Sequence, residues 1–471
     1  MSTLEAGAAA VTIEVPDGCD VSGFCLRGLP EGIHEPPQIA ALLVADGERE
    51  AAVLACDVLG LRTDTARGLR AALSERDGVP ADAILLACSH SHALPTLDRD
   101  FKLGGLQDEW TEANEEYAAR FLDAMGEALA AARAALRPAR IGAASGQSSI
   151  GVNRRFELPD GKMIIGRNPD GYVDRTVSVV RIDGQDGVPI ASLVGFGCHP
   201  ITLGPEANVV SADYPAAVRH VVEGATGAPC LFLQGAVGDV TVVDGMGGDP
   251  AIADRLGRVL GHEAAKVWEE IEPRNIEVRY ELVRSFNTIQ SMLKEQRPDP
   301  PAHVAARLEA IDVPLHDAPS ADVALAVIAR VEREIEQARA DGETEGRLNI
   351  RRIERRWATR AFEAAREGRS DRAAADVQVL AINDIRLVAL PVEPLSRTAA
   401  ILRETVGPGA ICVGCANGPI GYMPLPEHYP EGGYEVSSYC RTYGLPGPLA
   451  PGASGLILAT AARLAREAAA A

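Results

Sequence analysis

The sequence predicts an α/β protein in which a mixed β-sheet core is flanked by helices. Short apolar runs of strand length alternate with longer amphipathic segments along the whole chain. Hydrophobic residues make up 46% of the 471 residues and charged residues only 24%, so the chain is too apolar to be disordered. Because the two kinds of segment interleave without a break, we expect a single domain spanning residues 1–471.

Apolar runs that are bounded by turn residues predict the strands of the sheet. The run Ile39–Ala45 (IAALLVA) is typical, because it is apolar throughout and a buried strand tolerates no charge on either face. The predicted strands cover residues 39–45, 51–56, 82–88, 139–144, 175–182, 189–197, 229–234, 275–283, 376–382 and 385–391.

Amphipathic segments between these runs predict helices. The clearest covers residues 109–136, where Tyr117, Phe121, Met125 and Leu129 recur every four residues. A proline shortly after its end cannot continue the helix and supports that boundary. Further helices are predicted over residues 63–75, 250–268 and 453–468.

Residues 300–375 do not follow this alternation of strands and helices, and we expect a helical insertion there. Residues 320–340 predict an acidic helix and residues 345–368 a basic one. The arginine run 351–360 alone would suggest nucleic-acid binding, but pairing of two antiparallel helices of opposite charge explains it more simply. We expect this hairpin either to cover a site or to mediate formation of a homo-oligomer.

Charge and cysteine usage limit the partners and the compartment. A net charge of −20 and a pI near 5.0 argue against a protein that grips nucleic acid or an anionic membrane. No stretch is long and apolar enough for a membrane span, and the N-terminus shows no export signal. The nine cysteines are scattered and odd in number, and most lie in apolar runs, which favours reduced thiols and a cytoplasmic location.

Histidine is scarce, and three histidines follow predicted strands. His90 and His92 form an H-x-H after the strand 82–88, and His199 ends the strand 189–197. In an extended chain, H-x-H places both imidazoles on one face, about 6–7 Å apart. Both could then reach one metal ion, or one could bind metal while the other contacts substrate. The alternative is that each histidine merely hydrogen-bonds a neighbouring loop.

Two further segments follow predicted strands. Gln234 to Thr241 is rich in glycine, which exposes backbone N–H groups and lets a ligand approach closely. Glu393 lies between two prolines after the strand 385–391. It could begin the helix expected from about residue 395, or it could be an oxygen ligand with little freedom to move.

Together, His90, His199 and Glu393 offer two imidazoles and one carboxylate. Catalytic zinc commonly takes three such protein ligands and leaves one position for water. Zinc lowers the pKa of that water to about 7, which supplies a hydroxide nucleophile at neutral pH. These residues therefore predict a metallohydrolase, without defining its substrate.

At these positions the sequence resembles the neutral ceramidases, zinc amidases that cleave the N-acyl bond of ceramide. The segment Ser89–Pro95 (SHSHALP) resembles the family signature T-H-T-H-S-x-P, and Gln234 to Thr241 resembles its G-D-V-S loop. The segments GCHPIT at 197–202, PVEP at 391–394 and NGPIGY at 417–422 are similar to further family motifs, in the same order. We therefore expect the fold of the ceramidase catalytic domain, and that domain alone.

The resemblance implies a role for each matched residue. His90, His199, Glu393 and Tyr422 would bind Zn²⁺, and His92 and Tyr434 would bind the scissile carbonyl and stabilise its oxyanion. A cation near residue 154 would hold a polar or anionic group of the substrate, with Arg154 as the first candidate and Arg155 as the alternative.

Two features of this sequence differ from the ceramidase family and change the activity that we expect. Thr241 stands where the family has serine, and its β-branch disfavours a covalent role. We expect attack by zinc-bound hydroxide, with Thr241 orienting the substrate. Aromatic residues make up only 4% of the chain, which offers little lining for a long acyl groove.

The predicted activity is therefore zinc-dependent hydrolysis of an amide bond in a soluble small N-acyl compound. A zinc esterase or lactonase on the same scaffold, or an inactive ligand-binding relative, remains the alternative.

Overall fold

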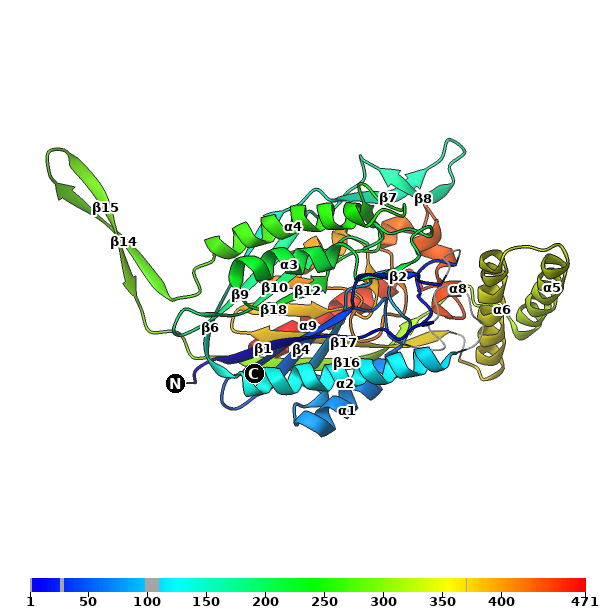
Figure 1. Ribbon diagram of the computed structural model, residues 1–471, viewed down its shortest axis with the longest axis horizontal. Coiled ribbons are helices and arrows are strands. Elements are labelled where there is room, and N and C mark those ends of the chain that lie inside the picture. The colour runs from blue at the N-terminus through cyan, green and yellow to red at the C-terminus, as the bar shows by residue number, and fades with distance from the viewer. Residues whose placement is uncertain (1, 26–28, 98–109, 370) are drawn as a thin grey trace.

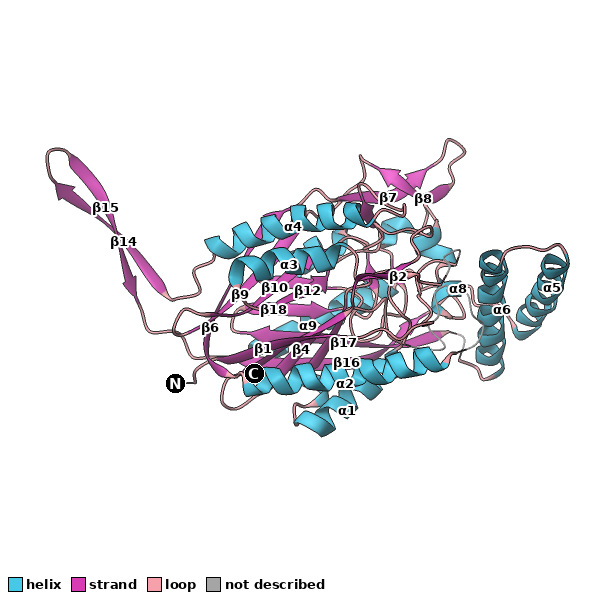
Figure 2. Cartoon of the chain, in the orientation of Figure 1, coloured by secondary structure: helices cyan, strands magenta, loops and turns pink. Residues whose placement is uncertain are grey.

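An eight-stranded sheet and a four-stranded sheet form the centre of the protein (Figure 1). The computed structural model describes residues 2–25, 29–97, 110–369 and 371–471. Helices cover the outer faces of both sheets (Figure 2). One continuous apolar core contains residues from both sheets, for example Leu54, Leu233 and Leu387. The predicted fold class, a mixed sheet flanked by helices, is confirmed.

The eight-stranded sheet is mixed and has two parallel pairs, β4 with β5 and β10 with β12. Both pairs lie near the ends of the sheet, and the remaining neighbours are antiparallel. The order along the sheet is β12 (Cys230–Gln234), β10 (Pro189–Phe196), β9 (Thr176–Gly184), β6 (Arg137–Gln147), β1 (Glu5–Thr12), β3 (Gln38–Ala45), β4 (Glu50–Cys56) and β5 (Ile84–Cys88).

The four-stranded sheet has the order β16 (Val304–Pro314), β17 (Arg372–Ile382), β18 (Ile385–Ala389) and β20 (Ala410–Val413). Its last pair, β18 with β20, is parallel. The C-terminal helix α9 (Ala453–Ala469) packs on β16 and β17. The predicted strands are confirmed, although the one at 275–283 belongs to neither of these two sheets, and β1, β16 and β20 were not predicted. The alanines and glycine of β1 give a weak strand signal, and β16 lies in the segment that was expected to be helical.

Helix α7 (Arg397–Val406) packs on β20 and α9, whereas α1 to α4 pack on the eight-stranded sheet. Helix α2 (Glu112–Ala134) packs on β1 and β3, and α1 (Thr63–Asp77) packs beside it. Helices α3 (Tyr214–Thr226) and α4 (Pro250–Glu270) pack against each other, α3 on β12 and α4 on β6 and β9. Thr111 caps α2 by accepting from the Asn114 amide at 3.2 Å. The predicted start of this helix, at 109, lies outside the described residues.

The segment 300–375 differs from the prediction in its extent. Its helices are α5 (Ala321–Ala340) and α6 (Glu345–Arg366), and the strands β16 and β17 that flank them pair along their whole length. The helical part is therefore narrower than predicted, because the ends of this segment extend the four-stranded sheet. The two helices project from one end of the molecule (Figure 1).

Apolar packing, rather than opposite charge, joins α5 to α6. Trp357, Ala358 and Ala361 of α6 pack against Ala324 of α5. Arg330 and Glu354 form an ion pair between the helices, with an Nη2–Oε1 distance of 2.9 Å, but both side chains are partly exposed. An exposed ion pair contributes only ~0–1 kcal/mol, so the buried apolar contact dominates.

Short strands complete the structure. They are β2 (Gly32–Glu35), β7 (Gly151–Glu157), β8 (Met163–Asn168), β11 (Val209–Ser211), β13 (Val240–Val242), β14 (Ile276–Arg284), β15 (Thr288–Gln296), β19 (Glu393–Pro394) and β21 (Tyr422–Met423). All nine cysteines are free, as predicted, and all but Cys25 are buried. Within the described part of the chain, every helix is too short or too polar to cross a bilayer.

Candidate active site

The predicted site residues follow the carboxyl ends of strands from both sheets. His90 follows β5, His199 follows β10 and Glu393 follows β18. Backbone hydrogen bonds join the loops after these strands: Gly235 N–H donates to Phe196 O at 3.0 Å, and Gly238 N–H donates to Pro394 O at 2.9 Å. Ligand sites of α/β proteins commonly lie at this edge. Residues that are more than 300 positions apart therefore meet in one place.

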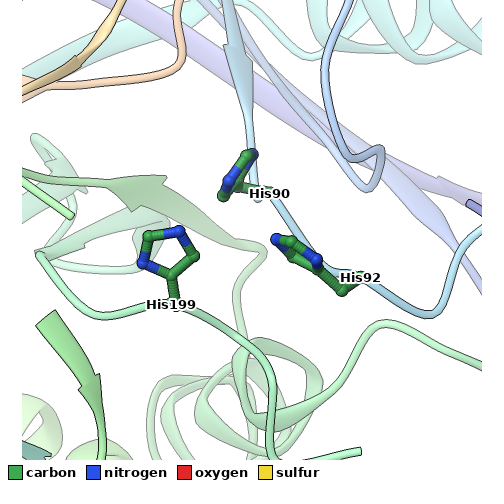
Figure 3. A group of neighbouring side chains, drawn as sticks. All are labelled: His90, His92 and His199. Atoms are coloured by element: carbon green, nitrogen blue, oxygen red, sulfur yellow. The ribbon is translucent and has the colours of Figure 1, made fainter. Parts of the chain in front are cut away.

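The three histidines form a cluster in which His90 and His199 are buried and His92 is partly buried, and their rings point towards one another (Figure 3). The ring centroid of His90 lies 5.0 Å from that of His92 and 5.2 Å from that of His199. The centroids of His92 and His199 are 5.7 Å apart. One nitrogen from each ring can be chosen so that all three atoms lie within 4.8 Å of one another, a geometry that could hold a metal ion.

The backbone at His90 differs from the expected extended chain. Strand β5 ends at Cys88, and His90 has a φ of 65°, in the left-handed region. Its N–H donates to Val58 O at 3.0 Å instead of continuing a strand. A non-glycine residue in this conformation costs about 1–2 kcal/mol. This turn, rather than strand alternation, places the His90 ring at right angles to the His92 ring.

Backbone carbonyls orient all three imidazoles through Nδ1. His90 Nδ1 lies 2.6 Å from Leu59 O, His199 Nδ1 lies 2.9 Å from Val237 O, and His92 Nδ1 lies 3.2 Å from Gly23 O. A carbonyl oxygen only accepts, so each Nδ1 carries the proton and each Nε2 keeps its lone pair. Histidines that bind metals are typically held in this way.

Glu393 completes a compact donor set with two of the histidines. Its Oε2 lies 3.0 Å from His199 Nε2 and 3.4 Å from His90 Nε2. Strand β19 pairs with β21, which places Tyr422 directly beside Glu393, with its hydroxyl 3.3 Å from His199 Nε2. The structure thus brings the four predicted metal ligands together.

Two buried atoms of this set lack a hydrogen bond within the described structure. They are His90 Nε2 and Glu393 Oε2. Leaving a buried acceptor unsatisfied costs about 1–3 kcal/mol, and more for a charged group. A divalent cation among two imidazole nitrogens, a carboxylate oxygen and a phenol oxygen would satisfy both atoms. The residues present therefore fit a zinc ion.

Electrostatics favour the protonation states that a metal requires. Burial and the nearby Arg154 together lower the pKa of His199 to about 4, so His199 is neutral. Burial, together with His90 and His199, likewise lowers the pKa of His92 well below its usual value. Burial alone would raise the pKa of Glu393, but the two histidines hold it well below its usual range. Neutral imidazoles and an ionised carboxylate are the ligand forms of zinc.

Arg154, rather than Arg155, reaches the histidines. Arg154 Nη1 lies 3.1 Å from His199 Nε2, and its Nε donates to Glu435 Oε1 at 2.8 Å. Arg155 donates to Glu435 Oε2 at 3.0 Å and to Glu431 Oε2 at 3.0 Å. Of the two candidates, Arg154 is therefore the one that lies beside His199. Glu435 holds both arginines, so β7 is fixed to the loop that carries Tyr434.

Tyr434 lies beside Tyr422, and Thr241 lies next to the residue whose carbonyl contacts His199. The ring centroid of Tyr434 is 5.5 Å from that of Tyr422, and the Tyr434 hydroxyl is 3.1 Å from Thr442 Oγ1. Burial raises the pKa of Tyr434 to about 12, so its hydroxyl stays protonated. Thr241 follows Val240, whose carbonyl oxygen lies 3.0 Å from His199 Nδ1.

The glycine-rich segment serves backbone packing rather than the approach of a ligand. A Cβ at Gly238 would lie 2.8 Å from Glu393 O, and a Cβ at Gly235 would lie 2.9 Å from Gly197 N. Both positions therefore require glycine so that the loops can meet. Because the N–H groups of both glycines bond neighbouring loops, the expectation that they face a ligand was wrong.

Sequence reasoning missed two residues that support the site. The Tyr443 hydroxyl donates to Glu393 Oε1, which orients the carboxylate. Gln234 Nε2 donates to Ser89 O at 3.0 Å and to Cys198 O at 3.1 Å, which ties together the two loops that carry histidines. Four of the nine tyrosines lie between residues 429 and 443, and this local enrichment was the available signal.

A second group of potential ligands contains His34, Glu35 and Asp254. His34 Nε2 lies 3.3 Å from Asp254 Oδ1, and His220 Nε2 lies 3.7 Å from Glu35 Oε2. Each imidazole thus already faces a carboxylate, and the side chains are partly exposed. This group is satisfied as ion pairs, in contrast to the orphaned atoms of the buried cluster.

Comparison with known proteins identifies the fold. No protein-family model matches the sequence, and no curated protein is significantly similar to it. Among solved structures, a ceramidase complexed with C2 superposes with a TM-score of 0.67 at 15% identity, over 99% of this chain and 76% of the other. Neutral ceramidase from Pseudomonas aeruginosa gives a TM-score of 0.65 at 14% identity, over 99% and 74%. The predicted neutral ceramidase-like fold is confirmed.

Proposed function

We propose that this protein, which has the neutral ceramidase-like fold, is a zinc-dependent hydrolase that cleaves an amide bond of a small N-acyl substrate. One observation carries the proposal: Glu393 Oε2 lies within 3.4 Å of the ε nitrogens of both His90 and His199, and both Glu393 Oε2 and His90 Nε2 are buried without a hydrogen bond in the described structure. Sites with three or four such ligands are typical of catalytic zinc.

His90, His199, Glu393 and Tyr422 would hold the metal. Two nitrogen and two oxygen donors suit zinc better than calcium or magnesium, which prefer oxygen alone. When bound, zinc acts as a Lewis acid and makes a water-derived nucleophile available near neutral pH. Burial raises the pKa of Tyr422 well above its usual value, and Arg154, 5.2 Å from the ring centroid, opposes this shift.

His92 and Tyr434 would handle the reacting carbonyl and its protons. His92 would bind the scissile carbonyl and stabilise its oxyanion. Because its Nδ1 donates to Gly23 O, the Nε2 atom is the one that would face the substrate. Tyr434 is protonated, and its hydroxyl would turn its hydrogen from Thr442 Oγ1 towards the developing oxyanion.

Arg154 and Thr241 would position the substrate. Arg154 Nη2 is buried and makes no hydrogen bond within the described structure, so it can bind a polar or anionic substrate group. Thr241 would orient the substrate through its hydroxyl. A zinc esterase or lactonase differs from this enzyme mainly in the leaving group, and a catalytically inactive binding protein would keep the ligands without turnover.

Two variants test the metal assignment. His199→Ala removes a ligand and should lose both the bound zinc and all activity, whereas Thr241→Ala should keep the zinc and part of the rate. Elemental analysis of the purified proteins gives the zinc content directly. His316→Ala is the matched control, because His316 pairs with Asp317 outside the cluster. A full equivalent of zinc in His199→Ala would refute the ligand set.

Substrate class requires a separate assay. N-acyl amino acids, N-acyl amines and their matching esters or lactones are compared at saturating zinc. Faster turnover of the amides supports the amidase, faster turnover of the esters supports the alternative, and tight binding without turnover supports the binding protein.

A further inference from the structure

Strands β14 and β15 form a hairpin that projects from the body of the protein; we call residues 276–296 the arm (Figure 1). Within the described structure neither strand pairs with any other strand. The two strands pair along their full nine residues, from Ile276 opposite Gln296 to Arg284 opposite Thr288. An isolated two-stranded sheet is only marginally stable in water, so the arm is an element that needs a partner.

Large apolar side chains on the arm lie in water. Phe286 at its tip is fully exposed (101%), Leu282 is 74% exposed and Tyr280 is 62% exposed. The exposed set comprises Val278, Tyr280, Leu282, Val283, Phe286, Ile289, Met292 and Leu293. With fully exposed aromatic side chains of about 150–250 Å² and aliphatic ones somewhat smaller, the set exposes on the order of 900 Å². A standard interface needs about 800 Å² from each partner.

Strand alternation collects part of this set on one face of the arm. Val278, Tyr280 and Leu282 are two residues apart and therefore point to the same side. Met292 lies directly opposite Tyr280 in the ladder and joins them. The resulting apolar stripe follows the length of the arm, so its partner must also be elongated.

The charge of the arm favours a second copy of this chain as that partner. The arm carries three acidic residues (Glu277, Glu281 and Glu295) and three basic ones (Arg279, Arg284 and Lys294), hence 3 − 3 = 0 net charge. The whole chain carries −20. Two copies repel each other over most of their surfaces, and the neutral arm is a place where they can meet.

A groove beside the base of the arm supplies a second observation. It has a volume of about 1250 Å³ and is lined by Ile141, Ala143, Ile271, Pro273 and Pro301, among other residues. Nine residues of strand span about 30 Å, so the arms of two copies in antiparallel contact would place each tip near the base of the other. The exposed Phe286 would then face the groove of the partner.

We propose that two copies of this chain associate through their arms. The stripes of Val278, Tyr280, Leu282 and Met292 pack against each other about a two-fold axis, and Phe286 of each copy enters the groove at the base of the other. The arrangement is isologous and closed, so it yields a dimer rather than a fibre.

A lipid surface fits the arm less well. Insertion into a bilayer would use the tip, whereas the apolar stripe continues along the shaft. The arm also lies at the opposite end of the long axis from α8 (Cys440–Tyr443), whose Tyr443 contacts Glu393 in the site (Figure 1). An arm in that position cannot deliver a membrane lipid to the histidines.

The oligomeric state of the full chain tests the proposal. Light scattering coupled to gel filtration should give twice the 49.6 kDa chain mass for the wild type. The double variant Tyr280→Ser/Leu282→Ser should weaken association at least 100-fold and elute as a monomer. Val323→Ser/Leu325→Ser is the control, because it removes two apolar side chains of α5 that are each 53% exposed and tests association through the helical insertion.

Cross-linking tests the register of the two arms without relying on loss of association. Phe286→Cys/Ala143→Cys should form a disulfide between copies, whereas Phe286→Cys alone should not, since the two tips lie at opposite ends of the paired arms. The wild type, in which every thiol except that of Cys25 is buried, provides the background. Circular dichroism confirms that each variant is folded.

Three results would overturn the proposal. The first is a wild type that stays monomeric at high micromolar concentration. The second is a dimer that persists in Tyr280→Ser/Leu282→Ser and dissociates in Val323→Ser/Leu325→Ser. The third is a monomeric wild type that binds phosphatidylcholine vesicles through Tyr280 and Leu282.

Discussion

The tautomer of each clustered histidine is set by a carbonyl oxygen of the backbone. Leu59 O and Val237 O fix the rings of His90 and His199, and both carbonyls belong to loops that follow strands. The lone pairs of the Nε2 atoms therefore point towards the candidate metal position before a metal ion binds. Preorganisation of this kind avoids the loss of side-chain entropy on binding.

Tyr443 extends this preorganisation to the carboxylate. In Tyr443→Phe, Glu393 loses its hydrogen-bond donor while the packing of the ring is kept. We expect zinc affinity to fall about 10–100-fold, as is usual when an outer hydrogen bond to a metal ligand is removed. Competition with a chromogenic chelator measures the affinity.

Tyr429→Phe is the matched control for this change. The Tyr429 hydroxyl donates to the carbonyls of Leu449 and Ala450, away from Glu393. An equal loss of zinc affinity in both variants would show that Tyr443 acts only on general stability.

Among the elements, α1 is fixed to the four-stranded sheet by buried charges. Asp376 of β17 accepts hydrogen bonds from Arg67 Nη2 at 2.6 Å and from Arg70, both of α1. Burial alone would raise the pKa of Asp376, but hydrogen bonds from the two arginines hold it below its ordinary value of 3.8. The carboxylate therefore joins two elements that are distant in sequence.

The interaction of Asp376 with the two arginines predicts that the stability of the protein depends on pH. Because the pKa of Asp376 is lower in the folded state, its contribution is complete above the unfolded pKa near 3.8 and is lost as the pH falls towards the folded pKa. Asp376→Asn should lower the free energy of unfolding by about 3–5 kcal/mol at neutral pH, since it leaves two cations beside a neutral amide. Urea unfolding between pH 7 and acid measures both effects.

The unfolding free energies at low pH test whether ionisation of Asp376 causes the difference between wild type and Asp376→Asn. The difference between wild type and Asp376→Asn should shrink below the unfolded pKa, and a constant difference down to strong acid would contradict the linkage. Glu334→Gln, which breaks the exposed pair with Arg330, is the control and should cost less than about 1 kcal/mol.

For the molecule as a whole, the candidate metal centre joins the two sheets. His90 and His199 follow strands of the eight-stranded sheet, whereas Glu393 and Tyr422 follow strands of the four-stranded sheet. A ligand that binds only the folded protein stabilises it by about 2.7 kcal/mol at 100 times its dissociation constant. Zinc should therefore raise the Tm of the whole domain, and EDTA should reverse the gain.

The same melting experiment on His199→Ala provides the control. Its Tm should not respond to zinc, because one ligand is missing. A response equal to that of the wild type would place the stabilising zinc elsewhere, with the group His34, Glu35 and Asp254 as the next site to examine.

Local patterns determined much of this protein. Hydrophobic periodicity depends only on neighbouring residues, so it located every strand of the eight-stranded sheet except β1, the strands β17 and β18 of the four-stranded sheet, and helices such as α2 and α4. The sequence also identified His90, His199 and Glu393 as candidate metal ligands. Residue type and a position at the end of a strand are enough to propose a ligand.

Only the tertiary structure decided how these parts meet. The left-handed turn at His90, the contact of Tyr443 with Glu393 and the choice of Arg154 over Arg155 each depend on segments that lie far apart in sequence. The exposure of the arm is likewise invisible in the alternating pattern of β14, since that pattern records which side chains share a face and not what covers the face. Periodicity is a local property, whereas the edge at which strands converge is set by sheet order and loop packing.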